Sequence, residues 1–130
     1  DFTKVLPNAE VHGIDVSAYA IENSKEEIRG QLKEGRAESL PWPNNHFDLV
    51  YSLNTFHNLH AYELEPALRE FERVGKQHKY ICVESYRNEQ EKANLLYWQV
   101  TCEAFNTPEE WEWWFNLTGF TGDHSYIFFE

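Results

Sequence analysis

The sequence predicts an α/β fold built on a doubly wound, mostly parallel sheet with helices on both faces. Short apolar runs that favour strands alternate with amphipathic segments along the whole chain, a pattern typical of parallel strands joined by right-handed crossovers. The run FDLVYS at 47–52 is almost continuously apolar, which favours a strand buried on both faces. Polar residues follow this run directly, and α/β folds bind ligands just beyond the carboxyl ends of such strands.

The chain before this run predicts two short strands with a helix between them. Ser17 is a good N-cap and Gly30 a good stop signal for that helix. Gly13 lies inside the first strand, which indicates a close approach of the backbone there. We expect a helix tail at 1–6, a strand at 10–15, a helix at 17–29 and a second short strand at 32–36.

The chain after this run predicts three further helices and two further strands. Leu64, Leu68 and Phe71 repeat at helical spacing. Thr107 and Glu110 form a capping-box pattern that opens another helix, which Gly119 ends. We expect helices at 62–74, 88–105 and 107–118, and strands at 79–85 and 125–129.

Composition excludes several classes of partner. The net charge of −11 repels phosphate backbones and anionic lipid, so neither nucleic acid nor a membrane surface is expected as a partner. No run approaches the roughly 18 apolar residues of a membrane span, and no signal peptide is visible. Cys82 and Cys102 lack metal-ligand spacing and suit a reducing cytoplasm, where we expect the protein. The Trp-rich surface also allows for a homo-oligomer interface.

Three sequence segments resemble the class I S-adenosylmethionine-dependent methyltransferases, in particular those that act on small molecules and lipids. They are VHGIDVS, then GRAESLPWPNNHFDLVYSLNTFHNL, then KYICVES. The resemblance implies a Rossmann-like fold, S-adenosyl-L-methionine as cofactor and methyl transfer to a small-molecule acceptor such as a sugar, a lipid headgroup or another metabolite. It implies one domain over 1–130 that lacks the family's first strand and glycine-rich loop, so the fold is expected to be incomplete at the amino end.

The same resemblance assigns the cofactor-binding residues. Asp15 matches the acidic residue that holds the ribose hydroxyls, and a carboxylate can accept hydrogen bonds from both. The alternative for Asp15 is a strand-end residue that favours the following helix dipole. Arg36 departs from the family, which often has an Asp there to bind the adenine amino group. The other positions carried over are Val16 on the adenine face, Ala37 through its backbone N–H, Glu38 beside it (with a structural role as the alternative), and Ser52 and Leu53 near the methionine part.

His57 is the candidate general base, because it lies in the loop after the central strand and a histidine can titrate near neutral pH. The alternative is a loop histidine without a role. His57 and His60 are spaced like metal ligands, but no third ligand is evident, so no metal is expected. Aromatic side chains can line an acceptor pocket or fill the core: Tyr86, Trp98, Trp111 and Trp114.

Two other functions compete with methyl transfer. A nicotinamide dehydrogenase would also place Asp15 on a ribose, but the segments AESLPW and FDLV do not belong to that pattern. A catalytically silent relative would use the fold only for binding or scaffolding, since fold alone does not determine function.

Overall fold

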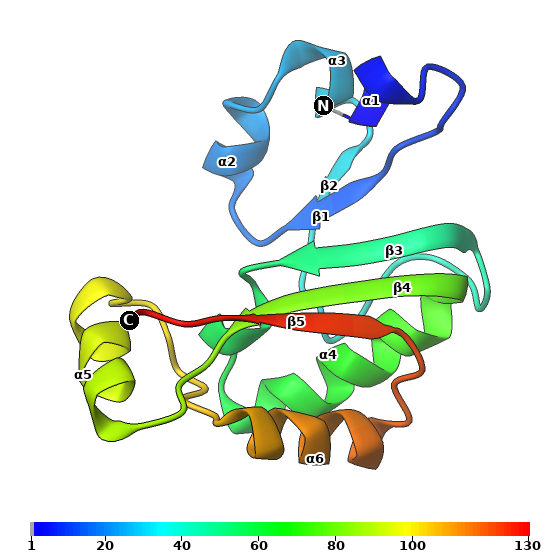
Figure 1. Ribbon diagram of the computed structural model, residues 1–130. Helices are drawn as coiled ribbons and strands as arrows, with labels where there is room; N and C mark the ends of the chain where they lie inside the picture. The colour runs from blue at the N-terminus through cyan, green and yellow to red at the C-terminus, as the bar shows by residue number, and fades with distance from the viewer. Residues whose placement is uncertain (1) are drawn as a thin grey trace. The chain divides into compact units, whose positions relative to one another are not determined.

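The computed structural model describes residues 2–130, so Asp1, the first residue of the expected helix tail, lies outside the described residues. Contacts divide the chain into two compact units, Asp1–Ala37 and Glu38–Glu130, so the single domain expected over 1–130 stays a prediction. The first unit holds α1 (Phe2–Val5), β1 (Gly13–Asp15), α2 (Ala18–Glu22), α3 (Glu26–Arg29) and β2 (Leu32–Glu34) (Figure 1). The second unit holds β3 (Phe47–Leu53), η1 (Phe56–Asn58), α4 (Ala61–Val74), β4 (Gly75–Glu84), α5 (Glu89–Trp98), α6 (Pro108–Thr118) and β5 (Asp123–Ile127).

In the first unit, β1 and β2 pair in parallel, with Gly13 opposite Leu32. A Cβ atom on Gly13 would lie 2.6 Å from Leu32 Cδ2, so the group that approaches Gly13 is a side chain of β2. The single helix expected at 17–29 is wrong, because the chain forms two short helices instead. Between them, the Asn23 amide donates to the Tyr19 carbonyl and the Ser24 hydroxyl to the Ile21 carbonyl, in addition to the backbone N–H groups of the same two residues.

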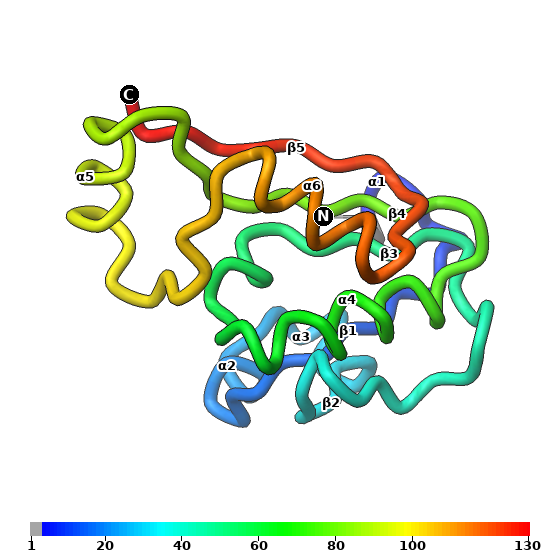
Figure 2. The backbone as a smooth tube through the Cα atoms, turned by 90° about the horizontal axis from the view of Figure 1, so that it is seen from below, coloured from blue at the N-terminus to red at the C-terminus, as the bar shows by residue number. Residues whose placement is uncertain are grey.

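The second unit is a three-stranded parallel sheet in the order β3-β4-β5. This confirms the expected α/β fold with parallel strands. Helices α4 and α6 pack against each other and lie on the same side of this sheet (Figure 1). The carboxyl end of the chain lies beside α5 (Figure 2), and there the Asn94 amide donates to the Phe129 carbonyl at 2.9 Å.

Strand β3 is half exposed, so the expectation that it is buried on both faces is wrong. Leu49, Tyr51 and Leu53 are 45%, 44% and 53% exposed. The reason is topological: in its sheet β3 pairs only with β4 and is an edge strand. Its apolar composition therefore does not report its burial within this unit.

The core of the second unit lies between the sheet and the two packed helices. Strand β4 has a partner on both sides and buries Ile81 and Val83 completely. The signals expected for α6 are confirmed, since Thr107 and Glu110 form the capping box and Gly119 takes the left-handed conformation at φ 71°. Other residues with no exposure are Leu64, Ala67 and Leu68 on α4, Leu95 on α5 and Trp111 on α6. No helix within residues 2–130 has the length and apolar composition to span a membrane.

Helix α5 ends at Trp98, so the helix expected to reach 105 is too long. The backbone N–H groups of Glu103 and Ala104 donate to the carbonyl of His57, at 2.8 and 2.9 Å. A continued helix would direct these donors at its own carbonyls. The contact with the loop after β3 replaces the last helical turns.

Replacing Gly122 with alanine is expected to lower the free energy of unfolding by about 2 kcal/mol, measured by urea denaturation. A Cβ atom there would lie 2.4 Å from the Lys79 carbonyl oxygen, which is backbone and cannot move aside as a side chain can. Gly30→Ala is the matched control, because nothing lies within 4 Å of its added Cβ atom. Equal stability of the two variants would contradict the close packing of Gly122, just before β5, against Lys79 on β4.

Candidate functional site

The tip of β1 presents Asp15 in a fixed orientation. The side-chain oxygen Oδ1 accepts the backbone N–H of Ser17 at 2.8 Å, and the carbonyl of Asp15 accepts the N–H of Gly35 at 2.9 Å. The Ser17 hydroxyl in turn accepts the N–H of Ala20, as expected of an N-cap. Asp15 is exposed and Val16 is 65% exposed. A carboxylate and an apolar side chain therefore stand side by side at the carboxyl end of a parallel strand.

The predicted adenine contacts follow β2. Ala37 is half-buried in a turn just beyond this strand. Because β1 and β2 are parallel and Asp15 pairs with Glu34, the structure places Asp15, Val16 and Ala37 at the same end of this two-stranded sheet. Glu38, half-buried, is the first residue of the second unit.

The tip of β3 holds the other predicted cofactor residues. Ser52 is half-buried and Leu53 is 53% exposed, at the carboxyl end of the strand. Asn54 then adopts φ 58°, a left-handed conformation that asparagine tolerates better than most residues. Its backbone N–H donates to the Cys82 carbonyl on β4 at 3.0 Å. The sharp turn after β3 is thus tied to the neighbouring strand.

His57, the predicted base, is enclosed by the protein and 1% exposed. Its Nδ1 accepts the backbone N–H of Glu84 at 3.2 Å. Its Nε2 lies 3.2 Å from Oε2 of the same residue, although the two atoms do not form a well-aligned hydrogen bond. Both ring nitrogens therefore face Glu84, the last residue of β4, and neither reaches solvent.

Burial favours the uncharged form of both side chains in this pair. It lowers the pKa of the His57 imidazole to about 4 and raises the pKa of the Glu84 carboxyl. Burial, followed by the negative charges of Glu84 and Glu103, also raises the pKa of the Cys102 thiol to about 12. Burial therefore disfavours a charged ion pair between His57 and Glu84.

Glu84 is the residue whose importance the sequence does not reveal by itself. Besides its contacts with His57, its carbonyl accepts the indole N–H of Trp111 on α6 at 3.1 Å. The available signal was positional, since His57 follows β3 and Glu84 ends the neighbouring parallel strand β4. Trp111 is fully buried and Trp98 is 66% exposed, so only Trp98 of these two stands at the surface.

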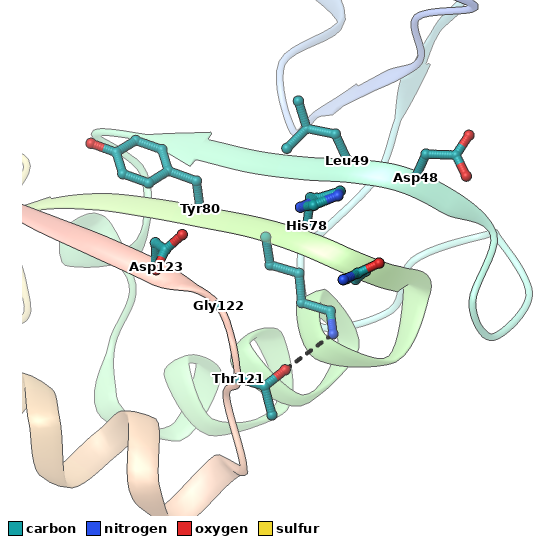
Figure 3. A pocket seen from close by; sticks show the side chains of 9 residues that line it. Asp48, Leu49, His78, Tyr80, Thr121, Gly122 and Asp123 are labelled. Atoms are coloured by element: carbon teal, nitrogen blue, oxygen red, sulfur yellow. Dashed lines mark hydrogen bonds between the residues drawn. The ribbon is translucent and has the colours of Figure 1, made fainter.

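No group of three or more His, Cys, Asp or Glu side chains within the described part of the chain is arranged to hold a metal ion. A shallow pocket of about 430 Å³ lies at the opposite, amino-terminal end of the sheet, and none of the predicted site residues lines it (Figure 3). In it, Leu49 and His78 pair across β3 and β4, and the Lys79 ammonium donates to the Thr121 hydroxyl. Its lining residues are Asp48, Leu49, Gln77, His78, Lys79, Tyr80, Thr121, Gly122 and Asp123.

Parallel strands with polar groups at their carboxyl ends define a Rossmann-like α/β protein. A family model described as a methyltransferase domain matches residues 2–83, which is more than half of the sequence. The chain therefore belongs to this family of S-adenosylmethionine-dependent methyltransferase domains, and the family's cofactor is S-adenosyl-L-methionine.

Two solved structures have a similar fold. The YcgJ protein from Bacillus subtilis shares 22% identity with a TM-score of 0.66, over 84% of this chain and 51% of that one. A protein from Thermotoga maritima, described as an S-adenosylmethionine-dependent methyltransferase and possible histamine N-methyltransferase, shares 24% identity with a TM-score of 0.55. That match covers 92% of this chain and 68% of the other. The chain thus spans about half the length of YcgJ. No curated protein matches the sequence.

Proposed function

We propose that the protein is a cytoplasmic enzyme that transfers the methyl group of S-adenosylmethionine to a small-molecule acceptor. The observation that carries the proposal is the fixed, exposed carboxylate of Asp15 at the end of β1, in a chain of the methyltransferase family. Supporting features are the net charge of −11 and two free cysteines, Cys82 and Cys102.

The residues at the tip of β1 fit the cofactor. One oxygen of Asp15 is held by the Ser17 N–H, which orients the carboxylate while leaving it exposed to accept from ribose hydroxyls. The exposed side chain of Val16 offers an apolar surface of the kind that an adenine ring covers. The backbone N–H of Ala37 follows the adjacent strand and suits the adenine edge.

When bound, S-adenosylmethionine supplies a methyl group on a positively charged sulfur, which is already an activated leaving group. The residues of this chain therefore have to position the acceptor against the methyl group and exclude water, rather than activate the leaving group. Asp15 would hold the ribose, and Ser52 and Leu53 would border the methionine part. A base is needed only where the acceptor loses a proton, and in this structure His57 faces Glu84 on both ring nitrogens.

The acceptor is proposed to be a neutral or cationic metabolite, a sugar or a lipid headgroup without phosphate, because the acidic chain disfavours anions. An amine is the first acceptor to test, since the similar Thermotoga maritima protein is described as a possible histamine N-methyltransferase. Release of S-adenosylhomocysteine from the full-length protein, in the presence of histamine and then of sugars and neutral lipids, measures transfer. Cofactor binding without release on any acceptor would favour a silent binding subunit.

Asp15→Asn is expected to weaken binding of S-adenosylhomocysteine about tenfold, or about 1.4 kcal/mol, by calorimetry on the full-length protein. The neutral amide keeps the size of the side chain but accepts ribose hydroxyls through one oxygen only. Asp48→Asn is the matched control, because Asp48 is an exposed aspartate at the amino end of the sheet and pairs with Lys76. No binding by the folded wild-type protein would refute the cofactor assignment, and equal loss in both variants would refute the role of Asp15.

A further inference from the structure

We propose that His57 is a positioning residue, which holds the loop after β3 against β4 and so fixes the tip of β3 where the cofactor is expected. This inference rests on the proposed function for the identity of the ligand. It assigns His57 a role different from that of a general base. The grounds are the contacts of its ring and backbone, which reach β4 and the segment before α6.

The first step is the direction of the ring contact. Because Nδ1 of His57 accepts the backbone N–H of Glu84, the neutral ring must carry its proton on Nε2. The protonated Nε2 lies 3.2 Å from Oε2 of Glu84, without a well-aligned hydrogen bond between them. Both side chains are nearly inaccessible, at 1% and 2% exposure. A base must instead present an unprotonated nitrogen to the acceptor.

The second step is the backbone of the same residue. The carbonyl of His57 accepts two N–H groups, from Glu103 and Ala104. The next residue, Asn58, accepts the Thr101 hydroxyl at 3.1 Å. The loop after β3 is therefore held by the segment that joins α5 to α6 as well as by β4.

The third step connects this loop to the expected cofactor edge. Only Asn54, Thr55 and Phe56 separate His57 from Leu53, and Asn54 is strained into the left-handed region at φ 58°. Such a conformation persists when the surroundings fix it. The His57 ring and the Asn54 N–H both bond this loop to β4. Loss of the ring contact should let Ser52 and Leu53 change position.

The test compares His57→Ala and His57→Asn in the full-length protein. The Asn side-chain oxygen can take the place of Nδ1 and accept the Glu84 N–H, whereas Ala cannot. We expect binding of S-adenosylhomocysteine to weaken about tenfold in His57→Ala and by no more than about twofold in His57→Asn. The matched control is His78→Ala, an exposed histidine on β4 at the opposite end of the sheet.

Two nuclear magnetic resonance measurements judge the proposal without the cofactor. The His57 ring should remain in the Nε2–H form from about pH 8 down to about pH 5, while an accessible histidine titrates in this range. The backbone amide signals of Ser52 and Leu53 should shift in His57→Ala and return in His57→Asn. If the wild-type protein binds no cofactor, the proposed function fails, and these two readings still decide the role of the ring.

Three results would overturn the positioning role. The first is a His57 ring that titrates like an accessible histidine. The second is cofactor affinity in His57→Ala that equals wild type. The third is loss of methyl transfer in His57→Asn with unchanged cofactor affinity and a shifted pH–rate profile, since that combination is the signature of a base.

Discussion

Replacement of Trp111 by alanine is expected to lower the free energy of unfolding by about 3–5 kcal/mol, the largest effect of any single substitution considered for this protein. The indole is fully buried and stacks on Phe115, with ring centroids 6.0 Å apart. Its removal leaves a large cavity, and the buried Glu84 carbonyl loses the hydrogen bond that it accepts from the indole N–H. Chemical denaturation followed by circular dichroism measures the change.

Trp113→Ala is the matched control, because it removes the same side chain from the same helix. Trp113 is 58% exposed, so its replacement is expected to change the free energy of unfolding by less than about 1 kcal/mol. A similar loss in both variants would mean that α6 does not turn its Trp111 face to the core.

Acidification is expected to destabilise the fold through His57, with a loss of roughly 3 kcal/mol as the pH falls from about 6.5 towards 4. The folded-state pKa of His57 lies at about 4 because the ring is buried, below the ordinary value of 6.5. Between these two pH values His57 binds a proton in the unfolded state but not in the folded state. The free energy of unfolding is therefore highest above pH 6.5 and decreases as the pH is lowered. Urea denaturation across this range should show the slope in the wild type and a smaller slope in His57→Asn.

Glu84 acts in the opposite direction, because burial raises the pKa of its carboxyl. Its contribution is present below its ordinary pKa and is lost as the pH rises through the raised value. Glu84→Gln removes this opposing effect, so its acid-induced loss of stability should be steeper than that of the wild type. The other ionisable groups in the cluster are Cys102 and Glu103, and both are unchanged in these variants. An identical pH dependence in His57→Asn and the wild type would contradict the burial of a neutral ring.

Local sequence signals predicted the structure where short-range interactions decide it. The start of α6 followed from Thr107, Pro108 and Glu110, and its end from Gly119, because caps depend on residues within one turn. The alternation of strands and helices along the sequence predicted the parallel topology, because a helix between two strands allows the chain to cross over and pair the second strand in parallel with the first. The family resemblance, carried by the segments around Asp15 and 47–52, agrees with the matched range of 2–83.

Expectations were wrong where distant segments decide the structure. The apolar sequence of β3 could not show that the strand has a partner on one side only within its sheet. The length of α5 could not be read from its own residues, because Glu103 and Ala104 donate to His57, far away in sequence. The enclosure of His57 likewise depends on Glu84, which lies 27 residues further on. The cofactor roles of Asp15, Val16, Ala37, Glu38, Ser52 and Leu53 stay predictions.

The uneven burial along the chain has a consequence for hydrogen exchange. No residue from 4 to 37 is buried, whereas β4 has a partner strand on each side and completely buried side chains. Amide protons of β1 and β2 should therefore exchange through small local openings, and those of Ile81 and Val83 only through global unfolding. Because Asp15 ends β1, a ligand held there should slow exchange at amides that are otherwise among the fastest in any strand of the protein. Occupancy by the cofactor would thus be visible in deuterium uptake at this strand pair, before any acceptor is identified.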